Sequence, residues 1–197
     1  SLLDNDFGTY PYVTSSNTSS GQIFAGTGFG IKDNHQIFGI TKAYTTRVGS
    51  GPFPSELFNK VGDHLVLKGQ EFGTVTKRKR RCGWFDTNLV KQTVQISGVS
   101  DIVLTKLDIL DELKEVKICV GYSINNSNYD YLPFNENLQK IISPIYEIMP
   151  GWQSSTFGIT KWSELPKNAQ NYINYIEEVV ETKISIISTG PERSQTI

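Results

Sequence analysis

Residues 101–111 of the chain read Asp-Ile-Val-Leu-Thr-Lys-Leu-Asp-Ile-Leu-Asp. Ile102, Val103 and Leu104 form a short apolar run rich in β-branched residues, which predicts a strand buried within a sheet. The run ends in Thr-Lys-Leu-Asp at positions 105–108. Because open α/β sheets bind ligands outside the carboxyl ends of their strands, we expect residues 105–108 to lie at a ligand-binding edge.

The residue types at this edge suit a guanine base. A carboxylate such as Asp108 can accept two parallel hydrogen bonds, from the ring N1–H and the exocyclic amine, and adenine lacks this donor pair. The stem of Lys106 can lie along the ring while its ammonium stays in water. The same tetrapeptide is also typical of a strand that runs into an ordinary turn. A guanine site therefore needs support from a second segment.

The rest of the pattern predicts an α/β fold with a mostly parallel sheet and flanking helices. An amphipathic helix that begins at Pro166 leads into a buried strand at residues 184–187, and Ser188-Thr189-Gly190 follows. This second strand end is polar, as the first is. The other predicted elements are helices at 34–45 and 87–96 and strands at 64–67, 116–124 and 144–149, with a hairpin turn at 125–128.

Length and charge exclude several classes of protein. The 197 residues are most simply one domain, and the formal net charge of −1 argues against general affinity for nucleic acid. No apolar run approaches the ~20 residues that span a bilayer, and no signal peptide is visible, so we expect a cytoplasmic protein without a membrane partner. Cys82 and Cys119 lie far apart without metal-ligand spacing, which favours reduced thiols.

A basic run, Lys-Arg-Lys-Arg-Arg at residues 77–81, is the second informative stretch. It has three interpretations: a solvated loop, an RNA-binding or nuclear-localisation patch, or a substrate loop whose arginines bind carboxylates and phosphates. Gly73 and Gly83 flank the run, together with aromatic residues that could anchor it to a core. No other basic stripe exists that could follow a nucleic-acid backbone. These two observations favour the substrate loop.

Seven runs of residues form a longer pattern along the chain. They are Asp-Phe-Gly-Thr-Tyr-Pro at 6–11, Val-Thr-Ser-Ser-Asn at 13–17, Thr-Arg-Val-Gly-Ser-Gly-Pro-Phe-Pro at 46–54, Arg-Arg-Cys-Gly-Trp at 80–84, Thr-Lys-Leu-Asp at 105–108, Met-Pro-Gly-Trp at 149–152 and Ser-Thr-Gly-Pro at 188–191. In these motifs and their order the chain resembles the adenylosuccinate synthetase family over nearly its whole length.

The resemblance implies part of a P-loop-NTPase-like ligase fold. The family joins L-aspartate to inosine monophosphate (IMP) with GTP hydrolysis, which gives adenylosuccinate, GDP and phosphate in the AMP branch of purine biosynthesis. GTP phosphorylates the 6-oxygen of the purine, and the aspartate amine displaces that phosphate. The only methionine is Met149, so the chain starts without an initiator, and we expect a carboxyl-terminal half. Residues 1–86 would carry the IMP and aspartate loops, and residues 87–197 the guanine-binding part.

The family's phosphate loop, its catalytic aspartate and histidine, and most of its Mg²⁺ site belong to the amino-terminal half. The resemblance therefore implies no catalytic residue and no metal site in this chain, an inactive isolated fragment, and a homodimer for the whole enzyme. The alternative function is a non-catalytic GTP-binding module. An RNA-binding protein that uses residues 77–81 is a third possibility.

The resemblance also implies binding roles, residue by residue. Thr14 would bind the phosphate of IMP, and the Val48 backbone its ribose. The aspartate loop would consist of Thr74, Val75, Thr76, Lys77, Arg78, Lys79 and Arg80, with Arg78 also on IMP and Arg80 also on GTP. The GTP base would lie among Lys106, Leu107, Asp108, Ser188, Thr189 and Gly190. Two residues depart from the family: Val75 replaces an expected threonine, and Lys77 a common glycine.

Overall fold

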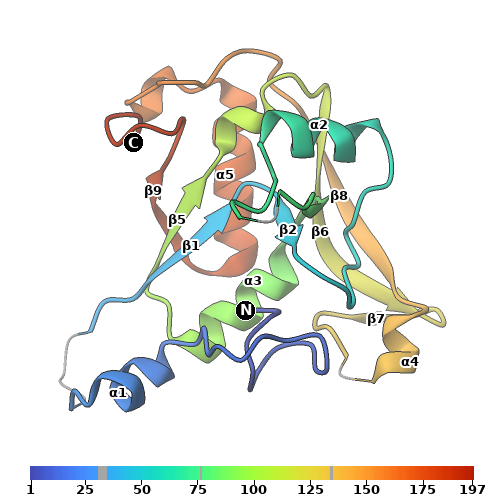
Figure 1. The fold of residues 1–197 in the computed structure, drawn as a ribbon. Helices are drawn as coiled ribbons and strands as arrows, with labels where there is room; N and C mark the ends of the chain where they lie inside the picture. Colours follow the sequence, from blue (N-terminus) through green and yellow to red (C-terminus); the bar gives the residue numbers. More distant parts are fainter. Residues whose placement is uncertain (31–34, 76, 134) are drawn as a thin grey trace.

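The computed structural model of the chain describes residues 1–30, 35–75, 77–133 and 135–197. It has an α/β fold in which a three-stranded parallel sheet is ordered β1-β5-β9 (Figure 1). These strands are β1 (Phe38–Lys42), β5 (Asp101–Thr105) and β9 (Lys183–Ile187). The buried run at 102–104 thus forms the central strand, as the sequence predicts.

A second sheet stands beside the first and is mixed. Its long strand β6 (Glu115–Ile124) pairs in parallel with β4 (Phe85–Asp86) and antiparallel with β7 (Ser127–Tyr129) and β8 (Ser143–Pro150). The predicted hairpin turn joins β6 to β7. A third, two-stranded antiparallel sheet contains β2 (Thr45–Arg47) and β3 (Arg81–Gly83).

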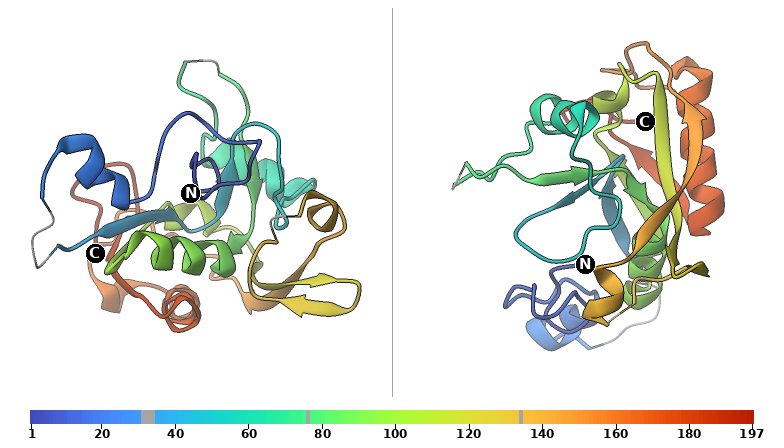
Figure 2. Two further views of the ribbon diagram at one scale, coloured as in Figure 1. Left: turned by 90° about the horizontal axis from the view of Figure 1, so that it is seen from below. Right: turned by 90° about the vertical axis from the view of Figure 1, so that its right-hand side faces the viewer.

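Two long helices cover the sheets. They are α3 (Thr87–Ser97), which is capped by the Asp86 side chain and ends at Gly98, and α5 (Lys167–Val180), which begins directly after Pro166. The remaining helices are α1 (Gly21–Thr27), α2 (Lys60–Lys68), α4 (Glu136–Gln139) and two short 3₁₀ helices, η1 (Leu107–Leu110) and η2 (Trp162–Glu164). Figure 2 shows α5 on one side of the β6–β8 pair and α2 on the other.

The core forms where α5 meets both sheets. Leu104 of β5, Ile118 of β6, and Tyr172 and Ile176 of α5 have no exposed surface. The Tyr172 hydroxyl donates to the carbonyl oxygen of Ala43 at 2.7 Å, which satisfies the one polar group that this side chain buries. This packing fixes the relative positions of the strands whose ends carry the predicted site.

Two local predictions are wrong. The described part of the segment at 34–45 contains strand β1, not a helix, because pairing with β5 supplies its backbone hydrogen bonds. The segment at 64–67 belongs to helix α2, whose start is fixed by the Asn59 side chain accepting from the backbone N–H groups of Val61 and Gly62. No helix within the described ranges is long and apolar enough to cross a bilayer.

Candidate functional site

The carboxyl ends of β5 and β9 meet at one edge of the parallel sheet. The backbone N–H of Ser188 donates to the carbonyl oxygen of Leu104 at 2.8 Å, and the N–H of Leu107 donates to the carbonyl oxygen of Ser188 at 3.5 Å. The segments 106–108 and 188–190 are therefore neighbours. The structure brings together the two strand ends on which the sequence-based guanine site depends.

Asp108 lies in η1 at this edge, half-buried. Burial raises the pKa of its carboxyl group, and within the described ranges no other residue donates a hydrogen bond to it. A half-buried carboxylate in this state can accept hydrogen bonds from a ligand. The carboxylate is thus available for the role predicted for it.

The other residues of the predicted guanine site contribute mainly backbone. Leu107 and Thr189 have no exposed surface. The Thr189 hydroxyl donates inward to the carbonyl oxygen of Ile159 at 2.8 Å, and the Ser188 hydroxyl donates to the carbonyl oxygen of Gly190 at 2.8 Å. At Gly190 an added Cβ would lie 2.3 Å from the side-chain oxygen of Gln195. These positions shape the turn.

Lys106 has a left-handed backbone, with φ of 61°, and its side chain is directed to helix α2 and the loop after it. Its ammonium donates to the carbonyl oxygen of Gly69 at 2.6 Å and to Oε1 of Glu71 at 2.8 Å. The ammonium is thereby tied to the segment that opens the aspartate loop. This link was not predicted from the sequence.

The predicted aspartate loop is the end of a hairpin that projects from the body of the molecule (Figure 2). The N–H of Arg80 donates to the carbonyl oxygen of Glu71 at 2.8 Å, and the N–H of Gly73 to that of Arg78 at 2.9 Å. Val75 is 91% exposed, Thr74, Lys77 and Arg78 are exposed as well, and Thr76 lies outside the described residues. The tip of the hairpin is therefore accessible to a ligand.

Two members of this loop form ion pairs. The exposed Lys79 pairs with Asp63 of α2 at 3.0 Å, and Arg80 pairs with Glu71 at 2.8 Å. Lys77 has φ of 53°, in the left-handed region that glycine occupies most easily. Glycine, the residue that the family resemblance implies here, would adopt this conformation at lower cost.

Glu71 lies at the centre of a charged cluster that sequence reasoning missed. Its carboxylate has no exposed surface and accepts from Lys42, Tyr44, Arg80 and Lys106 at 2.7 to 2.8 Å. Burial alone would raise the pKa of Glu71, but hydrogen bonds from Lys106, Lys42 and Tyr44 lower it to about 2. The carboxylate is ionised at neutral pH, and three cations surround it.

Thr14 and Val48, the predicted IMP residues, lie on loops joined by Arg47. The Arg47 guanidinium is buried and donates to Thr9 Oγ1 at 2.7 Å and to the carbonyl oxygens of Tyr12 and Ser50 at 3.1 and 3.0 Å. Burial lowers the pKa of Arg47 to about 10, so it stays charged at neutral pH. Arg47 therefore fixes the loop that precedes Thr14 against the loop that follows β2.

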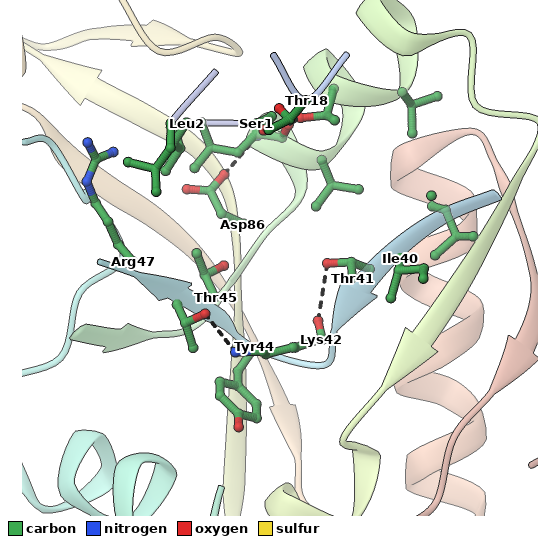
Figure 3. Close-up of a pocket in the computed structure, with 18 of the residues that line it drawn as sticks. Ser1, Leu2, Thr18, Ile40, Thr41, Lys42, Tyr44, Thr45, Arg47 and Asp86 are labelled. Atoms are coloured by element: carbon green, nitrogen blue, oxygen red, sulfur yellow. Dashed lines mark hydrogen bonds between the residues drawn. The ribbon is translucent and has the colours of Figure 1, made fainter. Parts of the chain in front are cut away.

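A cavity of about 480 Å³ opens beside β1, β2 and α3 (Figure 3). Its polar lining includes Lys42, Thr46, Arg47, Arg80 and Asp86. Val48 also lines it, so the structure brings a predicted IMP residue and an aspartate-loop residue to one cavity. Thr14 and the predicted guanine residues are not among the lining residues, and the guanine site is a separate surface at the sheet edge.

Asp86 is the buried carboxyl group at this cavity. The Tyr122 hydroxyl contacts both of its oxygens, at 2.9 and 2.8 Å, and the N–H of Leu89 donates to one of them at 3.2 Å. Burial raises the pKa of Asp86 to about 6, although Tyr122 opposes the shift. Asp86 caps helix α3. In the described ranges no group of three or more His, Cys, Asp or Glu side chains is placed to hold a metal ion.

Comparisons with known proteins identify the fold. A structure of fully ligated adenylosuccinate synthetase from Plasmodium falciparum matches with a TM-score of 0.95 and 42% identity, over 100% of this chain and 47% of that one. The succinoaminodeoxyadenylate synthetase of cyanophage S-2L, bound to dGMP and dATP, matches with a TM-score of 0.58 over 100% of this chain and 43% of that one. At 16% identity the phage enzyme supports the fold alone.

The chain therefore spans about half the length of the solved enzymes it matches. The shared fold confirms the sequence-based expectation of part of an α/β ligase fold with a parallel sheet and flanking helices. The family model described as adenylosuccinate synthetase matches residues 1–197. On the family match and the 42% identity together, the chain belongs to the adenylosuccinate synthetase family.

Proposed function

We propose that this chain forms the guanine-recognising and aspartate-recognising part of a ligase that joins L-aspartate to IMP with GTP hydrolysis. The observation that carries the proposal is the meeting of segments 106–108 and 188–190 at one sheet edge, through the hydrogen bonds of Ser188 and Leu107. The half-buried Asp108 carboxylate supplies the acceptor pair that guanine requires. Family membership supports the same assignment.

Within this proposal, each described segment has one task. Asp108 accepts from the guanine N1–H and amine, and the backbone of the 188–190 turn lies against the other side of the base. Arg78 and Arg80 bind the carboxylates of aspartate, with Thr74 completing the loop, because guanidinium groups pair with carboxylates in a bidentate way. Thr14 binds the phosphate of IMP, and the backbone of Val48 contacts its ribose.

The bond-making step follows from the substrates. GTP transfers its terminal phosphoryl group to the 6-oxygen of IMP. The aspartate amine then attacks the ring carbon that carries this oxygen, and phosphate leaves with the oxygen to give adenylosuccinate. This chain binds and orients GTP, aspartate and IMP for that step, and we assign no catalytic residue to it. We further propose that the whole enzyme is a cytoplasmic homodimer.

Calorimetric titration of the 197-residue chain with GTP, ATP and IMP tests whether this chain binds substrates without catalysing the reaction. An assay of adenylosuccinate formation by the full-length protein accompanies it. Guanine-selective binding by the chain without turnover is expected, together with turnover by the full-length protein. Turnover by the chain alone would contradict the absence of catalytic residues. A full-length protein that binds GTP but forms no adenylosuccinate would contradict the ligase assignment and favour a GTP-binding module.

A further inference from the structure

Glu71 closes the base of the hairpin that carries the predicted aspartate loop. Its N–H donates to the carbonyl oxygen of Val66 near the end of α2 at 2.9 Å, and its carbonyl oxygen accepts from the N–H of Arg80 at 2.8 Å. Phe72 and Lys79 form the next antiparallel bridge of the hairpin. The backbone of Glu71 thus holds the hairpin against a helix, at the position from which the loop departs.

The side chain of Glu71 is hydrogen-bonded on both oxygens. Oε1 accepts from Tyr44 at 2.7 Å and from Lys106 at 2.8 Å, whereas Oε2 accepts from Lys42 and Arg80, each at 2.8 Å. A carboxylate offers about four lone-pair sites, and here four donors occupy them. The carboxylate therefore has no lone-pair site left for a further hydrogen bond, for example from a substrate.

Full occupancy and complete burial restrict what Glu71 can do. A general base must reach the proton that it removes, and this carboxylate has no exposed surface. The carboxylate contacts groups that can reach substrates, because Arg80 and Lys106 are about one-third exposed. An effect of Glu71 on substrate recognition can therefore pass through these two side chains.

Arg80 and Lys106 come from different recognition elements. Arg80 ends the hairpin of the aspartate loop, and Lys106 directly follows β5 at the guanine edge. Each donates to a different oxygen of one planar carboxylate, so a displacement of either cation moves the acceptor of the other. Lys42, at the end of β1, and the Tyr44 hydroxyl hold the same carboxylate from the sheet side, which limits how far it can shift.

We propose that Glu71 is a positioning residue that sets Arg80 for aspartate and Lys106 for the guanine base, and so couples recognition of the two substrates. This inference rests on the proposed function. It adds a residue that touches neither substrate but controls two that do. Glu71 lies outside the sequence motifs of both recognition elements. Only the fold brings Lys106 and Arg80 to it.

The decisive variant is Glu71→Gln in the full-length protein. The amide keeps one acceptor oxygen and turns an NH₂ group toward the cations, so at most one pair of donors keeps its partner. We expect the Michaelis constants for aspartate and for GTP both to rise about tenfold or more, because small displacements of binding groups have large kinetic effects. The preference for GTP over ATP should fall in the same variant.

Two further variants separate positioning from support of the fold. Tyr44→Phe removes one hydrogen bond to the same carboxylate but leaves its charge, Arg80 and Lys106 in place. It should lower the melting temperature and leave both Michaelis constants within about twofold, because Lys42 still holds the carboxylate from the sheet side. Glu71→Asp keeps the charge on a stem one methylene shorter, so it should raise both constants in the same direction by a smaller factor than Glu71→Gln does.

Three results would overturn the inference. The first is a Glu71→Gln protein with a lower melting temperature but unchanged Michaelis constants. The second is a rise in the constant for one substrate alone, since that would remove the coupling. The third is failure of both Glu71 variants to fold while Tyr44→Phe folds, which would assign a purely structural role. A wild-type protein that makes no adenylosuccinate would instead contradict the proposed function itself.

Discussion

The backbone N–H of Ser188 donates to the carbonyl oxygen of Leu104 at 2.8 Å, so the last turn after β9 is fixed to the last residues of β5. Parallel neighbours in a sheet end at the same edge, and polar groups that follow them converge there. This bond and the one from the Leu107 N–H to the Ser188 carbonyl oxygen make the segments 106–108 and 188–190 neighbours.

Asp108→Asn in the full-length protein should weaken the use of GTP. The asparagine amide presents an NH₂ donor to the guanine amine, which is also a donor, so one of two buried hydrogen bonds is lost. The expected cost is about 1 to 3 kcal/mol in kcat/KM for GTP. The kcat/KM for xanthosine triphosphate should rise relative to that for GTP, because its 2-oxygen can accept a hydrogen bond from the new amide. Steady-state kinetics with GTP, ATP and xanthosine triphosphate measure this change.

Asp111→Asn is the matched control, and it should lower stability without changing nucleotide preference. Asp111 follows η1, and its carboxylate accepts from Trp152 Nε1, Thr156 N and Thr156 Oγ1 at 2.7 to 2.8 Å. An amide there leaves at least one buried donor unpaired, which should lower the free energy of unfolding by about 1 to 3 kcal/mol. Nucleotide preference should stay as in the wild type. If Asp108→Asn and Asp111→Asn altered base preference equally, the guanine assignment to Asp108 would be wrong.

The helix–strand units could be predicted because their signals are local. The apolar face of α5, with Pro166 before it, and the glycine that ends α3 at position 98 are all readable within one segment. Strand β1 was missed because Ile37, Ile40 and Tyr44 fit a helical period, while the pairing of Phe38 with Asp101 that selects a strand is non-local. Local propensity yields to such tertiary pairing.

In the candidate site, too, local motifs could be predicted and non-local contacts could not. Motif order suggested the residues of the guanine edge and the aspartate loop, and the structure places the two parts of that edge together. The Glu71 cluster could not be predicted, because no spacing in the sequence reveals that Lys42 and Lys106 converge on one carboxylate. Arg47 was missed for a similar reason: its partners Thr9 and Tyr12 belong to a distant loop.

Lys77→Gly should stabilise the aspartate loop. For a residue with a Cβ, a left-handed conformation such as the φ of 53° at Lys77 costs about 1 to 2 kcal/mol. Glycine removes that cost but adds conformational freedom to the unfolded chain, so the net gain in unfolding free energy should be below about 1 kcal/mol. We expect the aspartate Michaelis constant to fall as well. Chemical denaturation and aspartate kinetics measure the two effects.

Val75→Thr tests the other departure that the family resemblance implies. Val75 is 91% exposed, so the substitution disturbs no packing and adds a hydroxyl to the loop. One additional hydrogen bond should lower the aspartate Michaelis constant by about two- to tenfold and leave the constant for GTP unchanged. The double variant with Lys77→Gly gives the combined effect. An aspartate constant unaffected by either change would show that these two positions do not set aspartate affinity.

Asp86 should make the protein less stable as the pH rises from about 4.5 to 6.5. Burial raises the pKa of Asp86 to about 6 in the folded protein, whereas the unfolded chain releases this proton near its ordinary value of 3.8. The folded state therefore binds more protons in this window, and the stabilisation present at low pH is lost as the pH passes through the folded pKa. The titration of Glu71 changes stability in the opposite direction, because its pKa is lowered to about 2, and it does so below this pH window.

Asp86→Asn isolates this contribution. The neutral amide can still accept from Tyr122 but does not titrate, so the fall in unfolding free energy across the window should become shallower by up to about 1.4 kcal/mol per pH unit. Asp108, whose pKa is also raised by burial, remains in both proteins and cancels in the comparison. Denaturant titrations of both proteins at several pH values give the slopes. Parallel slopes would mean that Asp86 keeps an ordinary pKa in the folded protein, with water reaching its carboxylate from the neighbouring cavity.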